Sequence, residues 1–470
     1  MTQRLTARFR SFGSESLVTS EGGDFAFVDN SFAGRFKEGT LTVEEKDLSL
    51  AKRLMAPSDS DWRVKSLALQ AQRQHENRAR EIRYFMVIPT LRCNLACSYC
   101  QVSRAPLDAK GFDWEEKHLA AFEQFFSANA AENVKIEFQG GEISLRPDMI
   151  EAVEKIANKY CSKVELVACT NLYEISDRFE QLFSKDNFYI STSLDGNIDA
   201  MSKNRTKSDS DAQSNIDNIK SVIDRYGIDK ISFLPTITEN NIDDPASLVN
   251  LYATLGASGI FLRPVNYQGF ARKQHSKSSS DFECWIDFFE RALAEIKQLN
   301  RHQYFEEVYI ADLVRTIFLN KETAFIDFRS PSDFLKDMAV IDFDGTIYPT
   351  DESRMLTRTR HVDLSVGTIF DGLDEAKISQ LNNSADKEAH PDCLRCAYMP
   401  YCGVDMIDDL SRYKRIDLPK SQTWYCNKQM FFFDWIFDKV RKQDVEWLTI
   451  FARWAYKDAN PTQNLDALIA

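Results

Sequence analysis

The chain has 470 residues, of which 43% are hydrophobic and 27% are charged. This composition is typical of a folded globular protein and excludes a disordered chain, and the length predicts a main domain with smaller additions. The 71 acidic residues outnumber the 58 basic ones, and the formal net charge of −13 argues against a general nucleic-acid or anionic-membrane surface. The N-terminus lacks the apolar segment of a secretory signal and no stretch reaches about 18 apolar residues, so we expect a cytoplasmic protein.

Residues 1–80 differ in pattern from the rest of the chain. Short alternating runs at 16–19 and 25–28 predict strands, and the spacing of the hydrophobic residues between 48 and 67 predicts helices. We therefore expect a small N-terminal α+β module. Its exposed strands could recognise a peptide or partner by pairing at an edge, and a module that only caps the next domain is the alternative.

From about residue 83 the pattern changes to six β-rich runs separated by amphipathic stretches. The runs cover 84–89, 134–139, 164–170, 188–194, 231–238 and 260–265. Helices are expected between them, for example over 117–128 and over 147–160, which has a proline in its first turn. Strands that alternate with helices favour a parallel sheet, so residues 81–325 are expected to form an α/β domain, a TIM-like partial (β/α)6 barrel.

Two polar segments, 202–214 and 273–280, follow the fourth and sixth runs. Loops in these places commonly form lids, and unstructured spacers are the alternative. Further helices are expected over 282–299 and 305–319, and a hairpin over 338–348 with its turn at Asp344-Gly345. Residues 326–470 form the last section, in which the aromatic residues between 431 and 447 are expected to pack in the core.

Three cysteines follow the first of the six runs: Cys93, Cys97 and Cys100. They could bind three irons of one [4Fe-4S] cluster and leave the fourth iron open. An open iron can chelate the amino and carboxylate groups of S-adenosylmethionine (SAM), whose one-electron cleavage gives a 5′-deoxyadenosyl radical. Half of a zinc site is the alternative, but no nearby His or Cys completes a set of four ligands.

The spacing Cys-x3-Cys-x2-Cys, with Tyr99 before the last cysteine, resembles the motif of the radical SAM superfamily. The resemblance implies that Tyr99 and six further residues bind the cofactor: Gly140, Gly141, Glu142, Ser193, Asp195 and Arg205. The first three stand where the family has Gly-Gly-Glu-Pro, and Ile143 replaces the proline. A simple turn at 140–143 and a solvated Arg205 are the alternatives. Thr170, Asn171 and Arg263 would face the same end of the barrel.

Four more cysteines lie near the C-terminus: Cys393, Cys396, Cys402 and Cys426. On spacing alone, a zinc site and an iron-sulfur cluster are both compatible with them. The run resembles a SPASM domain, which implies an auxiliary [4Fe-4S] cluster bound by all four thiolates. Met406 and Thr350 stand where that pattern has two more cysteines, which the resemblance assigns to a third cluster. We therefore expect two [4Fe-4S] clusters, or about 8 Fe per chain, and ordinary buried thiols at Cys161, Cys169 and Cys284.

Further runs, among them Phe138-Gln-Gly-Gly and Tyr401-Cys-Gly, resemble the His-Xaa-Ser system radical SAM maturases over about residues 90–430. The resemblance implies an enzyme that abstracts hydrogen from a ribosomally synthesised peptide or small protein with His-Xaa-Ser repeats and so installs a post-translational modification. It also implies an external electron donor such as flavodoxin or ferredoxin. An anaerobic sulfatase-maturing enzyme and a non-enzymatic zinc scaffold are the alternatives, and neither nucleic acid nor a membrane is an expected partner.

Overall fold

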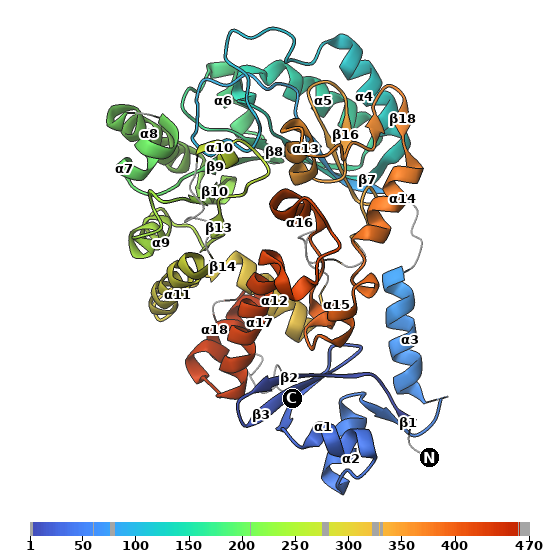
Figure 1. Cartoon of the computed structure of the whole chain (residues 1–470). Helices are drawn as coiled ribbons and strands as arrows, with labels where there is room; N and C mark the ends of the chain where they lie inside the picture. Colours follow the sequence, from blue (N-terminus) through green and yellow to red (C-terminus); the bar gives the residue numbers. More distant parts are fainter. Residues whose placement is uncertain are drawn as a thin grey trace.

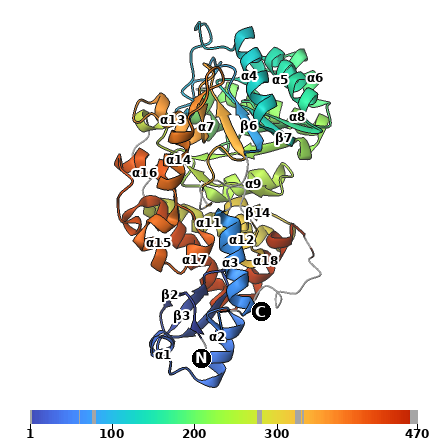
Figure 2. The ribbon, with the colours of Figure 1, turned by 90° about the vertical axis from the view of Figure 1, so that its right-hand side faces the viewer.

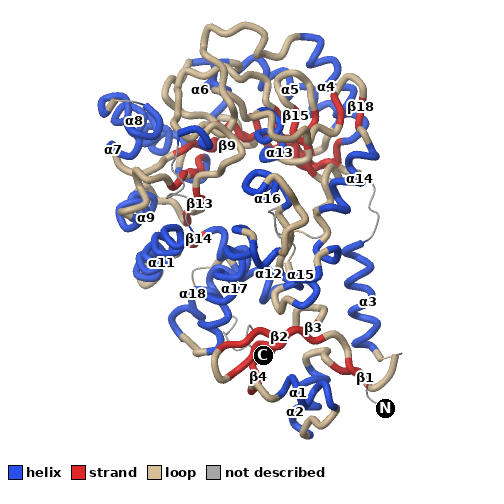
Figure 3. The backbone as a smooth tube through the Cα atoms, viewed as in Figure 1, coloured by secondary structure: helices blue, strands red, loops and turns tan. Residues whose placement is uncertain are grey.

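The computed structural model describes residues 3–59, 61–75, 80–206, 208–274, 282–321, 329, 332–458 and 460. Three tiers follow one another along the long axis of the molecule (Figures 1 and 2). The main sheet and its helices lie at one end, the helices α17 (Trp424–Arg441) and α18 (Val445–Tyr456) lie in the middle, and the N-terminal module lies at the other end. The strands are concentrated in the two outer tiers (Figure 3).

Seven strands form the main sheet, in the order β10-β9-β8-β7-β6-β15-β16. Their bounds are β6 Ile82–Val87, β7 Ala130–Phe138, β8 Lys163–Cys169, β9 Phe188–Ser193, β10 Ile231–Leu234, β15 Met338–Ile341 and β16 Ile347–Tyr348. All neighbouring pairs are parallel except β15 with β16. The first five predicted runs therefore contribute adjacent strands, and the expected α/β class with a parallel sheet is confirmed.

The fifth and sixth predicted runs are broken into short strands. Pro235 lies between β10 and β11 (Thr236–Ile237), and proline lacks the N–H group that a continuous ladder needs. The sixth run forms β12 (Gly259–Ile260) and β13 (Arg263–Pro264). Because β11 pairs with β13 in parallel, the sheet direction continues beyond β10.

Nine helices among the described residues alternate with the strands or follow them along the chain (Figure 1). They are α4 Glu116–Asn129, α5 Pro147–Tyr160, α6 Asp177–Phe183, α7 Ile198–Met201, α8 Asp209–Tyr226, α9 Pro245–Thr254, α10 Ala271–Gln274, α11 Phe282–Leu299 and α12 Val308–Leu319. The helices predicted at 117–128, 147–160 and 282–299 are confirmed. The helix predicted from 305 begins later, because Glu306 and Glu307 form strand β14 and Glu307 accepts a hydrogen bond from Ile310 N at 2.7 Å as the helix cap.

The prediction of a polar loop over 202–214 is wrong. Residues Ser202–Thr206 form a π-helical turn, and α8 begins at Asp209. Ser208 caps α8 by accepting a hydrogen bond from Asp211 N, and Ala212 and Ile216 lie four residues apart on its buried side. Capping and a buried apolar stripe thus outweigh the polar composition. The other expected loop, 273–280, lies outside the described residues apart from the end of α10.

The hairpin predicted over 338–348 exists, but its first strand has a further partner. β15 pairs with β6 in parallel, with Met338 opposite Tyr84 and Ile341 opposite Val87. This pairing joins residues that are more than 250 positions apart and was not predicted from the sequence. The C-terminal section therefore contributes two strands to the main sheet.

The N-terminal module contains a three-stranded antiparallel sheet of β2 Ala7–Phe12, β3 Glu15–Ser20 and β4 Phe25–Asp29. It also contains α1 Phe32–Glu38, α2 Val43–Ala51 and α3 Trp62–His75, and β1 Gln3–Arg4 pairs with β5 Met55–Ala56. Thr19 Oγ1 donates to Ala397 O at 2.8 Å, and Tyr401 Oη donates to Gly23 O at 2.6 Å. The module thus packs on the segment that carries the second group of cysteines.

The C-terminal section contains short helices and two long ones. They are α13 Asp351–Arg358, α14 Glu375–Ser384, α15 Pro391–Arg395, α16 Met406–Tyr413, α17 Trp424–Arg441 and α18 Val445–Tyr456. Phe432, Ile436 and Trp447 are buried, and Phe431 and Trp435 are half-buried against the same core, which confirms the predicted core packing. The expectation of a buried thiol is wrong for Cys284, which is exposed on α11. None of the described helices has both the length and the apolar composition that a membrane span requires.

Candidate active site

The first three cysteines lie in the loop that follows the C-terminal end of β6. Backbone hydrogen bonds fix this loop from three sides. Cys93 N donates to Ala105 O at 3.1 Å, Ser98 N donates to Asn204 O at 2.8 Å, and Phe270 N donates to Cys100 O at 3.0 Å. The cysteine loop, residues 93–100, is therefore fixed by segments that follow β9 and β13 as well as by its own chain.

Two glycines at the end of β7 pack against the base of the cysteine loop. Gly141 N donates to Thr90 O at 2.9 Å, and Glu142 N donates to Arg92 O at 2.8 Å. A Cβ atom on Gly140 would lie 2.3 Å from Thr90 O, and one on Gly141 would lie 2.2 Å from Arg92 O. Glycine is required here because backbone meets backbone. The sequence reasoning explained these glycines by the approach of SAM and missed this packing.

Glu142 is buried and links the ends of two strands. Its carboxylate accepts hydrogen bonds from Ser144 N at 2.9 Å, Thr170 Oγ1 at 2.6 Å and Asn171 N at 2.8 Å. Asn171 in turn donates from Nδ2 to Asn94 Oδ1 at 2.9 Å. The carboxylate thus connects the end of β7 with the end of β8, and Asn171 connects β8 with the cysteine loop.

Tyr99, Arg205 and Asp195 form a buried network beside the cysteines. Arg205 Nη1 donates to Tyr99 Oη at 2.6 Å, and Tyr99 Oη donates to Asp195 Oδ2 at 2.7 Å. Burial raises the pKa of Tyr99 well above its usual value, and burial also raises the pKa of Asp195 against the opposing effect of Arg205. Arg205 lies in the π-helical turn, a feature that is frequent at functional sites.

A cavity of about 1050 Å³ opens beside the cysteine loop at the C-terminal ends of the strands. Its lining includes most of the predicted site residues: Cys93, Cys97, Cys100, Tyr99, Gly140, Gly141, Glu142, Thr170, Asn171, Ser193, Arg205 and Arg263. Asp195 does not line the cavity and is connected to it through hydrogen bonds from Tyr99 Oη and Thr236 N. The polar atoms Thr192 Oγ1, Arg205 Nε and Gln268 Oε1 border the cavity, are buried, and have no hydrogen-bond partner in the described structure. Such atoms favour a polar ligand in the cavity.

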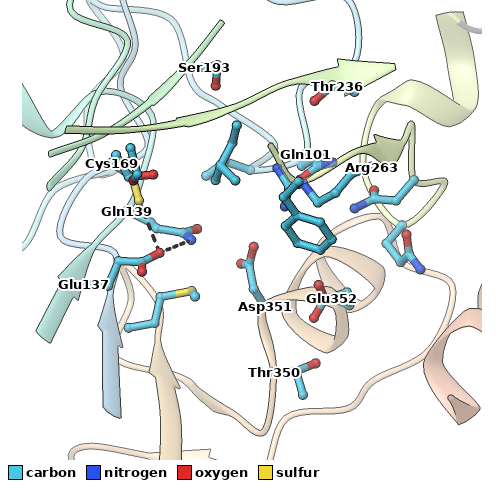
Figure 4. Close-up of a pocket in the computed structure, with 18 of the residues that line it drawn as sticks. Gln101, Glu137, Gln139, Cys169, Ser193, Thr236, Arg263, Thr350, Asp351 and Glu352 are labelled. Atoms are coloured by element: carbon cyan, nitrogen blue, oxygen red, sulfur yellow. Dashed lines mark hydrogen bonds between the residues drawn. The ribbon is translucent and has the colours of Figure 1, made fainter. Parts of the chain in front are cut away.

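The inner face of the sheet gives this cavity a polar wall that the sequence reasoning missed. Glu137 accepts hydrogen bonds from Tyr84 Oη at 2.6 Å, Gln139 Nε2 at 2.8 Å and Cys169 Sγ at 3.2 Å. Figure 4 shows Glu137, Gln139 and Cys169 grouped on this wall, with Asp351 pointing into the same space. The available signal was the alternation along β7 and the residue after it, which places Lys135, Glu137 and Gln139 on the face that lines the cavity.

The two positions at which the SPASM pattern has further cysteines also lie at this cavity. Thr350 and Met406 both line it, together with Asp351 and Glu352 from the first turn of α13 (Figure 4). Thr350 caps α13 by accepting a hydrogen bond from Ser353 N at 3.1 Å. Both side chains are buried, and Met406 belongs to the hydrophobic core at the edge of the cavity.

The chemistry of the first donor set fits an iron-sulfur cluster. Burial raises the pKa of Cys93 to about 12, and the charges of Glu142, Cys97 and Cys100 act in the same direction. Burial likewise raises the pKa of Cys97, against the effect of Arg205. These thiols would be protonated without a metal, and bound iron favours the thiolate form. Three thiols on one loop beside a large cavity suit a cluster with one iron left for a small ligand.

The second group of cysteines lies between α15 and the first turn of α17. Burial raises the pKa of Cys393 to about 11 and that of Cys426 to about 12, and the nearby Cys396 thiol adds to both shifts. Cys402 is affected by all three of the other thiols, so the four lie near one another. Among the described residues, no three His, Cys, Asp or Glu side chains are grouped closely enough for a single metal ion. A [4Fe-4S] cube is larger and holds its thiolates further apart.

Comparisons with known proteins agree with this geometry. Residues 87–251 match the model of the radical SAM superfamily, and no curated protein matches the chain. The fold is similar to anSMEcpe with bound AdoMet, with a TM-score of 0.62 and 18% identity over 77% of this chain and 98% of that one. It is also similar to Streptococcus suis SuiB bound to precursor peptide SuiA, with a TM-score of 0.53 and 14% identity over 88% of this chain and 97% of that one. The match and the three cysteines beside the cavity together show that residues 87–251 carry a radical SAM enzyme domain.

Proposed function

We propose that this chain is a radical SAM maturase that modifies a ribosomally synthesised peptide or small protein bearing His-Xaa-Ser repeats. The observation that carries the proposal is the cavity of about 1050 Å³, which the three cysteines share with a polar wall formed by the sheet. This volume is at the upper end of small-molecule pockets and leaves room for a peptide segment beside SAM. When bound, the cluster and SAM supply a 5′-deoxyadenosyl radical that removes a hydrogen atom from the substrate.

The chain's own residues would bind the cluster and SAM, orient them, and shield the radical from water. Cys93, Cys97 and Cys100 would ligate the cluster, and Arg205 would pair with the SAM carboxylate through its remaining N–H groups. Ser193 lines the cavity at the end of β9 and would donate a polar contact to SAM. Tyr99 and Asp195 fix Arg205 by the hydrogen bonds described above.

The glycine segment is proposed to complete the cofactor site. Gly140, Gly141 and Glu142 line the cavity directly next to the cysteine loop. Their backbone groups would meet the methionyl amino group, while the Glu142 carboxylate keeps the strand ends in place. The main domain, 81–325, is thus proposed to be a partial (β/α)6 barrel whose walls exclude water from the radical.

Residues 326–470 are proposed to form a SPASM-type domain with one auxiliary [4Fe-4S] cluster. Cys393, Cys396, Cys402 and Cys426 would ligate every iron of it, which leaves electron relay or structural support as its role. Thr350 and Met406 line the cavity and provide no thiolate there, which supports the absence of a third cluster.

Two structural relatives support a peptide substrate. SuiB was solved bound to its precursor peptide SuiA, and anSMEcpe was solved with AdoMet and the Cp18Cys peptide. In this chain, residues 1–80 are proposed to recognise the precursor or a partner protein. A deletion of 1–80 would also remove the contacts with Ala397 and Tyr401, so substitutions on the exposed face of the module are the cleaner test.

The cluster assignment is tested by iron and product analysis. Reconstituted wild type should contain about 8 Fe per chain, and Cys93→Ala should retain about 4 Fe and form no 5′-deoxyadenosine. Cys161→Ala, a thiol outside both groups, is the matched control and should behave as wild type. A wild-type value of about 12 Fe would refute the two-cluster assignment, and zinc without iron or sulfide would favour the scaffold alternative.

A sulfatase-maturing activity is the second candidate, because anSMEcpe shares the fold over 98% of its length. The two missing cysteines argue against it. Incubation with a sulfatase-derived peptide distinguishes the two candidates. Only a sulfatase-maturing enzyme would oxidise the target cysteine or serine side chain of this peptide to the aldehyde. Turnover of a His-Xaa-Ser peptide in its place would support the proposed maturase.

A further inference from the structure

A second hollow, of about 420 Å³, lies on another side of the cysteine loop. It shares Cys97, Cys100, Arg104 and Arg205 with the main cavity. The cysteine loop is therefore a thin wall between the two spaces. Two of the three cysteines that would ligate the first cluster can be approached from the second hollow without entry into the main cavity.

The lining of this hollow is positively charged, in contrast to the whole chain. It contains the cations Arg104, Lys203 and Arg205 and no carboxylate, whereas the chain carries a net charge of −13. Lys203 is exposed and pairs with Asp199 at 2.8 Å, which neutralises part of its charge. Arg104 has no carboxylate partner within the described structure. A local basic patch on an acidic protein attracts an acidic partner by long-range electrostatics.

The rim of the hollow also has a small apolar area. Pro106 is exposed and lines the hollow, and the side chain of the next residue, Leu107, is 47% exposed. Phe270 contributes a further apolar surface. A few apolar groups surrounded by charges are typical of short-lived protein complexes, whose interfaces are small.

The loop behind the hollow is rigid and directly connected to its lining. Phe270 N donates to Cys100 O, and Asn204 O accepts from Ser98 N. A Cβ atom on Gly269 would lie 2.7 Å from the backbone of Gln101, so the two segments are packed backbone to backbone. An electron that arrives at the lining therefore has a short, well-packed route to the cysteine thiolates.

We infer that this basic hollow, formed by Arg104, Lys203, Pro106 and Phe270, is the docking site of a small acidic electron-transfer protein of the flavodoxin kind. The inference rests on the proposed function, because only a first cluster at Cys93, Cys97 and Cys100 gives the electron a destination. One electron leaves the flavin hydroquinone anion, which becomes the neutral semiquinone, and the oxidised cluster gains it. No bond is broken and no proton moves in this step.

The test measures binding of flavodoxin to the full-length holoprotein. Arg104→Glu and Lys203→Glu should each raise the dissociation constant for flavodoxin by about tenfold. The affinity of the wild type for flavodoxin should fall as the salt concentration is raised. Lys163→Glu is the matched control, because Lys163 is exposed at the start of β8, at the opposite end of the sheet from the cysteine loop. It should bind flavodoxin as wild type does.

Reduction of the first cluster gives the second measurement. In both charge-reversal variants the rate with reduced flavodoxin should fall about tenfold, whereas the electron paramagnetic resonance signal after reduction by dithionite should be unchanged. Absence of that signal in the wild type would instead contradict the proposed function, while the binding measurement would still test the docking site.

Unchanged flavodoxin affinity in both variants, or an equal loss in Lys163→Glu, would overturn the inference. A small-anion site would be recognised by tight binding of inorganic phosphate that Arg104→Glu abolishes while flavodoxin binding is unaffected. That result would also overturn it.

Discussion

Gly141→Ala tests whether the glycine segment fixes the cysteine loop. The new Cβ atom would lie 2.2 Å from Arg92 O and 2.3 Å from Leu91 O, and both are backbone atoms that cannot rotate away. The hydrogen bonds from Gly141 N to Thr90 O and from Glu142 N to Arg92 O would have to lengthen or break. The loop and the end of β7 must therefore separate.

The expected free-energy cost follows from these contacts. Two backbone hydrogen bonds contribute about 1 kcal/mol each, and forcing an extra carbon into packed structure costs about 1–3 kcal/mol. We expect a local destabilisation of about 3 kcal/mol, which corresponds to a roughly hundredfold rise in the population of the opened loop. The Glu142 amide should exchange its hydrogen about a hundredfold faster than in the wild type.

Hydrogen exchange followed by mass spectrometry of peptides covering 88–100 and 138–146 measures this change. Gly34→Ala is the control, since no heavy atom lies within 4 Å of a Cβ atom at this position in α1. Alanine should stabilise that helix by up to about 1 kcal/mol. Wild-type exchange rates in both peptides of Gly141→Ala would refute the close packing of the two segments.

Three further outcomes are expected. Tyr99→Phe removes the acceptor of Arg205 Nη1, so the free energy of unfolding should fall by about 1–3 kcal/mol and SAM affinity, measured by calorimetry, by about tenfold. An unchanged SAM affinity in Tyr99→Phe would show that the position of Arg205 does not affect SAM binding. Arg354→Met leaves the buried carboxylate of Asp342 without its nearer cation and should cost about 3–5 kcal/mol in urea unfolding, of which Asp342→Asn in the same chain should recover a part. Burial raises the pKa of Glu307 from 4.5 to about 8, so the folded state retains a proton that the unfolded state has lost between these values. Wild type should therefore lose stability relative to Glu307→Gln by up to about 1.4 kcal/mol per pH unit as the pH rises from about 5 to 8, and a pH-independent difference would contradict this shift.

The sequence was sufficient to predict the regular elements of the main domain. The helices at 147–160 and 282–299 were predicted from apolar residues that recur with the helical period, and the first also from the proline in its first turn. The first four strands were also predicted within a few residues. Local signals succeeded here because each element is specified by its own residues.

The sequence failed where distant residues decide the structure. The segment after 202 has a polar composition, yet it forms a π-helical turn and the start of α8 because one side packs in the core. The partner of β15 depends on the edge that β6 leaves open. Neither is encoded in a short window of the chain.

By itself, the sequence determined the ligand types of this protein: the cysteine spacing and the glycine pair predict a radical SAM domain, and Thr350 and Met406 predict that a third cluster is absent. Only the tertiary structure decided how these residues are used. It showed that the glycines pack on the cysteine loop and that Asp195 lies outside the cavity, where it accepts a hydrogen bond from Tyr99. It also showed that Glu137 and Asp351 face the same cavity. The physical reason is that the ligand types follow from residue identity, whereas cavities and buried networks arise from parallel strands whose ends meet only after folding.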